Sequence, residues 1–128
     1  MIVVGGVIEE NGRYLIAQRK RGDAYELRWE FPGGKVRQGE TPEEALKREL
    51  SEELDLDVTV QEFLGAQEDS DSEGAVKILY YRVRVDSGSY TLNAHEKVQW
   101  VTLNELYKYS LLDGDRAFVK RLTDASIG

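Results

Sequence analysis

Glu49, Glu52 and Glu53 are the residues whose types and spacing point most directly to chemistry. Residues three and four apart lie on one face of an α-helix, so a helix through this segment would hold all three carboxylates within one turn. Their negative charges repel one another unless a cation lies between them. Hard divalent ions prefer such oxygen ligands, so the spacing predicts a site for Mg2+, with Mn2+ as a substitute.

The helix that would position these glutamates has a clear start. Thr41 to Glu44 match a capping box, in which the Thr41 hydroxyl accepts from the Glu44 amide and the Glu44 carboxylate accepts from the Thr41 amide. Pro42 falls at the first helical position, where its missing N–H is harmless. The helix would pack against the core of the protein through an apolar stripe beside its acidic face. This stripe is formed by Ala45, Leu46, Leu50 and Leu54. The carboxylates should therefore project along an edge of the core.

The segment before this helix is a tight bend that runs from Phe31 to Gly34. Its glycines, Gly33 and Gly34, let the backbone come close to a metal ion or a phosphate. Taken singly, each of these features is common, and an acidic helix face is most often only solvated. The combination in a fixed order is what distinguishes this chain.

The ordered spacing from Gly34 to Leu56 resembles the Nudix box, the signature of the Nudix hydrolases. The matching positions are Gly34, Glu40, Arg48-Glu49-Leu50, Glu52-Glu53 and Leu56. Asp55 departs from the pattern, because the family usually has a glycine there that ends the helix in a left-handed conformation, which Asp tolerates better than most residues. The resemblance implies one Nudix domain over residues 1–128, with an α/β fold: a three-layer α/β/α sandwich around a mixed β-sheet. It also implies a Mg2+-dependent hydrolase acting on phosphoanhydride bonds.

Two further segments resemble the MutT branch of this family, whose members remove pyrophosphate from nucleoside triphosphates. They are Trp29 to Lys35, and Ala94-His95-Glu96 followed by Trp100-Val101, which is most similar to CTP pyrophosphohydrolases. The branch implies conversion of an NTP or dNTP to the monophosphate and pyrophosphate, on cytosine or oxidised purine nucleotides such as 8-oxo-dGTP. One alternative is hydrolysis of another nucleoside diphosphate-X substrate. A non-catalytic module that senses nucleotides is disfavoured because every box carboxylate is present.

Position by position, the resemblance assigns the metal to the Gly33 carbonyl and to the carboxylates of Glu49, Glu52, Glu53 and Glu96. Arg48 would orient the box carboxylates through charge-assisted hydrogen bonds, while Glu40 would support the loop. The proton of the attacking water would pass to Glu49 or Glu53, with Glu96 as the rival base. Phosphate binding is assigned to Arg19, and the lining of the nucleotide pocket to Glu30, Phe31 and Asp115.

Asp115 occupies the place where MutT-type enzymes present an asparagine to an oxidised guanine. An ionised carboxylate only accepts hydrogen bonds, so it suits either the exocyclic amine of cytosine or the N1–H and N2–H2 of guanine. The sequence leaves both open. The alternative role for Asp115 is a second cap residue beside Asp113. His95 is predicted to be a loop residue near Glu96 and not a catalyst.

Composition narrows the class of protein. A chain of 128 residues fits one domain, and the absence of cysteine excludes disulfides and thiolate metal sites. Without a long apolar run or a signal segment, we expect a soluble, cytoplasmic monomer or homodimer with no membrane contact. The net charge is −7, and the charges are unevenly distributed along the chain. Residues 13–37 hold seven basic and three acidic side chains, whereas residues 38–73 hold two basic and thirteen acidic side chains. This arrangement suits a small polyphosphate delivered with metal ions and not a nucleic-acid polymer.

Strands and helices are expected on both sides of the box helix. Strands are predicted over residues 2–8 and 13–19, joined at Asn11-Gly12, and over residues 58–63, 76–85 and 98–101. The polar residues 68–74 are predicted to form a loop. A short helical turn over residues 103–107 and a final helix from Asp113 complete the predicted order.

Overall fold

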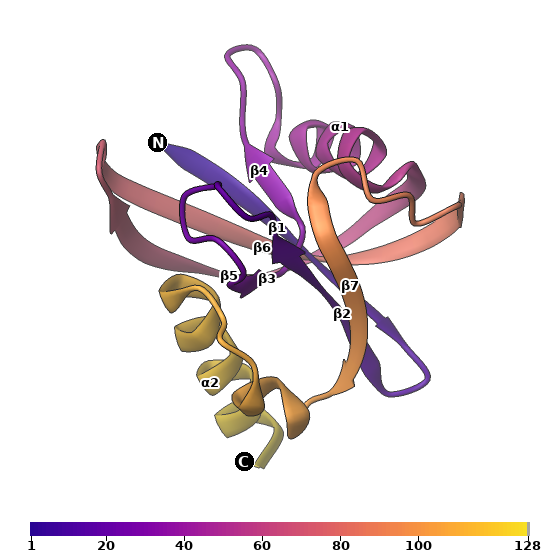
Figure 1. The fold of residues 1–128 in the computed structure, drawn as a ribbon, viewed down its shortest axis with the longest axis vertical. Coiled ribbons are helices and arrows are strands. Elements are labelled where there is room, and N and C mark those ends of the chain that lie inside the picture. Colours follow the sequence, from indigo (N-terminus) through magenta and orange to yellow (C-terminus); the bar gives the residue numbers. More distant parts are fainter. Residues whose placement is uncertain (128) are drawn as a thin grey trace.

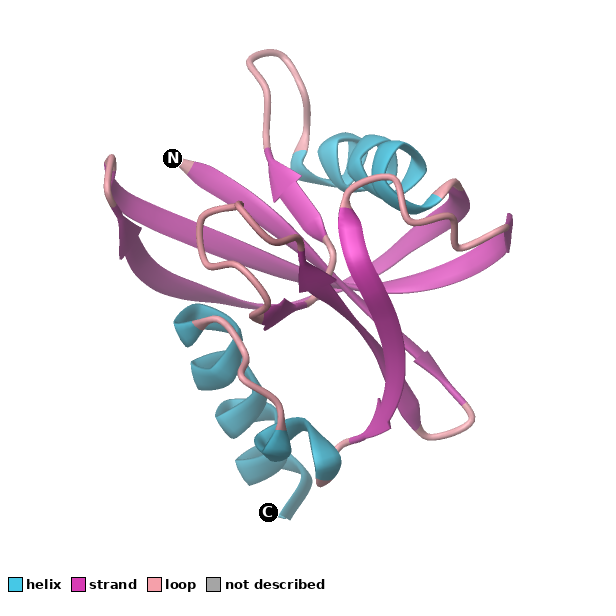
Figure 2. Ribbon diagram, in the orientation of Figure 1, coloured by secondary structure: helices cyan, strands magenta, loops and turns pink. Residues whose placement is uncertain are grey.

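The computed structural model describes residues 1–127, which form a sheet with helices on both sides (Figures 1 and 2). The strands are β1 (Ile2–Glu10), β2 (Arg13–Arg19), β3 (Trp29–Glu30), β4 (Gly33–Lys35), β5 (Leu56–Asp71), β6 (Gly74–Gly88) and β7 (His95–Thr102). The helices are α1 (Pro42–Leu54), the short 3-10 helix η1 (Glu105–Lys108) and α2 (Asp113–Ile127).

The sheet is mixed, as the resemblance implied. Its strands follow the order β3-β2-β1-β6-β5, while β4 pairs with β1 and β7 pairs with β2. β1 and β6 run parallel, whereas β1 with β2 and β5 with β6 run antiparallel. Parallel neighbours need a long crossover, and the chain passes through α1 between β1 and β6. The predicted turn between β1 and β2 is confirmed, since Asn11 and Gly12 have φ values of 53° and 77°.

Two separate apolar cores cover the two faces of the sheet. Successive strand residues point to opposite faces, and the neighbours Tyr80 and Tyr81 accordingly belong to different cores. The core beneath α1 includes Leu46 and Leu50, whereas the core beneath α2 includes Phe118. Figure 1 shows α1 and α2 on opposite sides of the strands. The three-layer arrangement is therefore confirmed.

The start and end of α1 agree with the prediction. The Thr41 hydroxyl accepts from the Glu44 amide at 3.1 Å, and the Glu44 carboxylate accepts from the Thr41 amide at 2.9 Å. Pro42 is the first helical residue, and the apolar stripe that includes Leu46 is buried. Asp55 ends the helix with φ of 52° and ψ of 44°, which is the left-handed conformation expected there.

The hairpin of β5 and β6 is longer than predicted, and the prediction of a loop over residues 68–74 is wrong. β5 continues to Asp71 and pairs with β6 nearly to the tip, with Glu68 opposite Lys77 and Asp71 opposite Gly74. Backbone pairing to β6 and opposite charges across the strands hold this polar segment. It lacks the alternating apolar residues from which a strand is recognised in sequence.

The remaining elements differ from the prediction mainly in length. The strand predicted over residues 98–101 extends over the whole of β7, and the helical turn predicted at 103–107 is η1. α2 begins at Asp113, one residue earlier than expected with Asp113 as the N-cap. Within the part of the chain that the structure describes, neither α1 nor α2 combines the length and apolarity needed to cross a membrane.

Candidate active site

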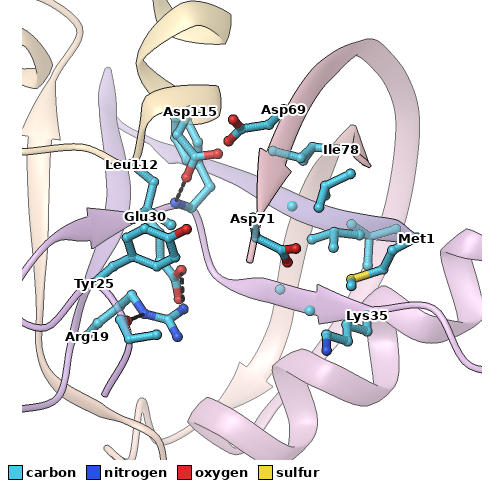
Figure 3. A pocket seen from close by; sticks show the side chains of 18 of the residues that line it. Met1, Arg19, Tyr25, Glu30, Lys35, Asp69, Asp71, Ile78, Leu112 and Asp115 are labelled. Atoms are coloured by element: carbon cyan, nitrogen blue, oxygen red, sulfur yellow. Dashed lines mark hydrogen bonds and ion pairs between the residues drawn. The ribbon is translucent and has the colours of Figure 1, made fainter. Parts of the chain in front are cut away.

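A cavity of about 990 Å³ lies beside β4 and α1 and is bordered by the tip of the β5–β6 hairpin (Figure 3). Seven of the predicted site residues line it, namely Arg19, Glu30, Phe31, Gly33, Glu49, Glu53 and Asp115. Among the described residues, the predicted site members Arg48, Glu52 and Glu96 lie outside this lining. The fold thus brings together residues from β2, β3, β4, α1 and α2.

The carboxylate of Glu49 packs directly on the backbone of Gly34. A β-carbon at Gly34 would lie 2.5 Å from Glu49 Cδ and within 2.7 Å of both carboxylate oxygens. No side chain fits in that space, so only glycine allows the carboxylate to take this position. The glycine bend therefore has a steric role toward Glu49.

Glu53 presents an unusual oxygen at the same end of the cavity. Its Oε1 atom is buried and, among the residues described, has no hydrogen-bond partner. The pKa of Glu53 is raised to about 9, chiefly by burial and then by the charges of Glu30 and Glu49, while a hydrogen bond from the Gly33 backbone opposes the shift. A buried carboxylate surrounded by like charges is stabilised by a bound cation.

The donor set therefore fits a divalent cation at Glu49, Glu53 and Gly33. Across residues 1–127, no three acidic or histidine side chains already stand together as metal ligands. The Arg48 guanidinium binds oxygens of both Glu49 and Glu52. Glu52 would have to leave Arg48 to join the other two carboxylates.

Arg48 is the centre of a charged network along α1. Its Nε and Nη2 atoms donate to the two oxygens of Glu40 at 2.7 and 3.0 Å, and its Nη1 atom donates to Glu49 at 2.9 Å. Nη2 also donates to the Lys35 carbonyl at 3.1 Å. The hydrogen bonds from Arg48 lower the pKa of Glu40 to about 2. This bidentate pair ties the loop before α1 to the middle of the helix.

A second charged chain links β2, β3 and β7. Arg19 Nη1 donates to Glu30 Oε1 at 3.0 Å, and the other Glu30 oxygen lies 2.9 Å from His95 Nε2. Arg19 also donates to the Ala24 carbonyl at 2.8 Å and to Asp23 at 2.9 Å. These bonds use three of the five N–H groups of a guanidinium, so a phosphate oxygen can still be bound.

The prediction that His95 is a loop residue is wrong. His95 is the first residue of β7, and its side chain is buried against Glu30. Among the described residues its Nδ1 atom has no hydrogen-bond partner. Sequence reasoning missed this contact because Glu30 lies 65 residues away along the chain. Glu96 follows in the same strand with an exposed side chain.

Asp115 lies at the other end of the cavity and is buried. Its Oδ2 accepts from the Phe31 amide at 3.0 Å, and its Oδ1 accepts from the Tyr80 hydroxyl at 2.5 Å. Burial raises the pKa of Asp115 to about 7, although the hydrogen bonds from Tyr80 and Phe31 oppose the shift. The carboxylate is thus turned toward β3 and β6, and not toward its own helix as the alternative of a cap residue required.

Tyr80 is the hydrogen-bond partner of Asp115 that sequence reasoning missed. It is buried, and its ring stacks on Phe118 with centroids 3.9 Å apart and planes inclined by 7°. The alternating pattern of β6 places Tyr80 in the interior, but the contact with Asp115 spans 35 residues of sequence. The cavity accordingly has Glu49 and Glu53 on its α1 side and Asp115 on its α2 side, where Tyr80 holds the Asp115 carboxylate from behind the cavity lining.

The NUDIX domain model matches residues 1–122 of the chain. A Mycobacterium tuberculosis protein named "Putative 8-oxo-dGTP diphosphatase 2" is 39% identical over 124 residues, covering 94% of this chain and 86% of that protein. The Escherichia coli CTP pyrophosphohydrolase is 33% identical over 113 residues, covering 88% of this chain and 84% of its own length.

The crystal structure of a MutT protein from Methanosarcina mazei has the same fold. It superposes with a TM-score of 0.89 at 24% identity, covering 98% of this chain and 94% of that one. The mixed sheet between two helices is therefore the Nudix fold. Since the family model spans nearly the whole sequence and relatives match along most of their lengths, the chain belongs to the Nudix family.

Proposed function

We propose that the protein is a Mg2+-dependent nucleoside triphosphate pyrophosphohydrolase that forms a monophosphate and pyrophosphate. The observation that carries this proposal is the layout of the cavity, with the unpartnered oxygen of Glu53 at one end and the carboxylate of Asp115 at the other. A nucleotide carries a polyphosphate at one end and a base at the other, and these match the two ends of the cavity. The names of the two relatives support a nucleotide as the substrate.

Glu49, Glu53 and the Gly33 carbonyl would hold the metal, joined by Glu52 and Glu96, whose side chains are exposed. Bound Mg2+ offsets the charge of the phosphates and lowers the pKa of a water molecule that it binds. Arg48 would orient Glu49 through the bond described above. Mn2+ is expected to substitute because it accepts the same oxygen ligands.

Glu53 is the residue that we propose as general base, with Glu49 and Glu96 as the other candidates. The buried Oε1 atom of Glu53 has no hydrogen-bond partner among the described residues, so it is available to accept a proton from a water molecule in the cavity. The attacking water would lose its proton to this carboxylate. Attack at the β-phosphorus would then release pyrophosphate.

Phosphate binding is proposed for Arg19 and for the basic residues that line the same cavity, Arg28, Lys35 and Arg37. Arg and Lys side chains form charge-assisted hydrogen bonds to phosphate oxygens. The like charges of Glu49 and Glu53 would repel a bare polyphosphate, so its binding should require the metal as well as these cations.

Asp115 and Phe31 are proposed to recognise the base, with Glu30 completing the wall between them and Arg19. Ionised Asp115 accepts from the exocyclic amine of cytosine or from the N1–H and N2–H2 of guanine. One of the two relatives is named for 8-oxo-dGTP and the other for CTP. These names support oxidised guanine and cytosine nucleotides as the first substrates to test. We further propose that the substrate belongs to the free cytoplasmic nucleotide pool.

The deciding experiment is a panel of normal and oxidised nucleoside triphosphates, scored for pyrophosphate release with and without Mg2+. Glu53→Gln should lower kcat by about 100-fold or more, as expected for loss of a general base. Glu10→Gln, an exposed glutamate at the end of β1, is the matched control and should retain activity. Tight nucleotide binding without hydrolysis would instead favour a sensor, and cleavage restricted to nucleoside diphosphate-X compounds would change the substrate class.

A further inference from the structure

Tyr25 is an aromatic residue that the proposed chemistry does not use. It lies in the connection between β2 and β3, and it lines the cavity with 50% of its surface exposed. The aromatic residues Phe31 and Tyr80, which both contact Asp115, are buried within the core. An aromatic ring left exposed beside a ligand cavity is available for contact with the ligand.

The backbone around Tyr25 adopts a conformation that L-residues usually avoid. Tyr25 and Leu27 both have φ of 61°, and neither is a glycine. This conformation is held by specific bonds: Arg19 Nε donates to the Ala24 carbonyl at 2.8 Å, and the Arg28 amide donates to the Tyr25 carbonyl at 3.1 Å. Backbone strain of this kind persists where the surrounding structure imposes it, and it concentrates at ligand sites.

The position of Tyr25 suits one face of a flat ligand. Figure 3 shows Tyr25 and Leu112 on one side of the cavity, with Met1 and Ile78 on the opposite side. Asp115 lies beside Asp69 at one end of the cavity, next to Leu112. A planar group that reaches Asp115 with its polar edge would therefore present one face toward Tyr25.

We propose that Tyr25 stacks on the nucleobase and is a substrate-binding residue of this enzyme, an inference that rests on the proposed function. Stacking on an aromatic ring depends little on which base is present, because every base has a π-face. Tyr25 would therefore supply affinity for nucleotides in general, while Asp115 distinguishes among them. Arg19 has a second role in this arrangement, since its bond to Ala24 holds the loop that presents the ring.

The test compares nucleotides with a substrate analogue that has no base. Tyr25→Ala should raise KM for CTP and 8-oxo-dGTP by about 5-fold or more, the lower end for loss of one base–aromatic stack. Its kcat should change little. Inhibition by inorganic tripolyphosphate, which carries the phosphates alone, should be unchanged. Tyr25→Phe should keep the wild-type KM, whereas Tyr25→Leu, apolar but not aromatic, should resemble Tyr25→Ala.

Tyr107→Ala is the matched control, because Tyr107 is a tyrosine of similar exposure, 42%, outside the lining of this cavity. Its KM for both nucleotides should equal the wild-type value. The proposal is overturned if Tyr25→Ala leaves KM unchanged, or if it weakens tripolyphosphate inhibition as much as nucleotide binding. If the wild-type protein releases no pyrophosphate, the proposed function fails. The stacking role of Tyr25 is then tested separately, by calorimetric measurement of CTP binding. Equal Kd values for wild type and Tyr25→Ala would refute the stacking role by itself.

Discussion

The carboxylate of Glu49 rests on the α-carbon of Gly34, where any β-carbon would lie only 2.5 Å from Glu49 Cδ. The contact joins β4 to the middle of α1, two elements that the chain brings together around the end of the cavity. It explains in steric terms why a glycine is needed at the start of the Nudix box in this protein.

Gly34→Ala is predicted to displace Glu49 and to lower kcat/KM by about 10- to 100-fold, the range for disturbing the support of a metal ligand. The rest of α1 should remain folded because its core residues are unchanged. Gly6→Ala is the control, since a β-carbon there would meet its nearest atoms at 3.4 Å. Steady-state kinetics of both variants measure kcat/KM, and circular dichroism checks that they remain folded. Full activity in Gly34→Ala would show that the Glu49 contact is dispensable.

Sequence alone predicted the parts of this site that depend on short-range interactions. The capping box and Pro42 at the start of α1 follow from neighbouring residues, the left-handed Asp55 follows from the resemblance to the Nudix box, and the structure confirms all three. Steric and hydrogen-bonding preferences act within a few residues, so such features can be inferred without knowing the fold.

The parts that could not be predicted depend on contacts between distant segments. His95 is buried by Glu30 from another strand, and Tyr80 reaches Asp115 from the sheet on which α2 packs. The tip of β5 is a strand because β6 pairs with it, although Glu68 and Asp71 carry no apolar pattern. Pairing partners and the position of a neighbouring helix are set by the whole fold.

Removal of metal should make stability depend on pH through Glu53. Its pKa is raised to about 9 in the folded protein, so between pH 4.5 and 9 the folded state binds more protons than the unfolded state. The stability that it contributes is present at low pH and is lost as pH rises through this window. In EDTA, Glu53→Gln should therefore have a flatter dependence of Tm on pH, with a higher Tm than wild type at pH 8.

Mg2+ should reverse this loss because it binds the ionised carboxylate and not the protonated one. Thermal melts at pH 5 and pH 8, each with EDTA or Mg2+, measure both effects, with Glu10→Gln expected to follow the wild type. Identical pH dependence in wild type and Glu53→Gln would contradict the assignment of this titration to Glu53.

Asp115→Asn should change base preference while keeping the fold. The amide oxygen can still accept from the Phe31 amide, and the amide nitrogen can donate to the Tyr80 hydroxyl. One acceptor toward the base is lost, so the ratio of kcat/KM for CTP and 8-oxo-dGTP should shift by about 10-fold. In wild type, kcat/KM should rise with pH through about 7 as Asp115 ionises, and this step should vanish in the variant. An unchanged substrate ratio would remove Asp115 from base recognition.

Tyr80→Phe should raise the pKa of Asp115 without abolishing its ionisation. The Tyr80 hydroxyl stabilises ionised Asp115, and its hydrogen bond lowers the pKa that burial raises. Without the hydroxyl, the midpoint in the pH profile of kcat/KM should lie above 7, and the free energy of unfolding should fall by about 1 kcal/mol. The stack on Phe118 should persist. Tyr107→Phe serves as control in the same urea and pH titrations, and a midpoint that stays in place would show that Tyr80 does not act on Asp115.

The short peptide from Phe31 to Gly33 contacts both ends of the cavity. Its Phe31 amide is bound to Asp115, its Pro32 carbonyl accepts from Gly6 at 2.8 Å, and its Gly33 backbone bonds to Glu53. Covalent geometry limits the span of two residues to about 7 Å. The peptide therefore sets an upper limit on the distance between its bond to Asp115 and its bond to Glu53. On the proposed function, this limit restricts which phosphorus of a bound nucleotide can lie next to Glu53 while the base contacts Asp115.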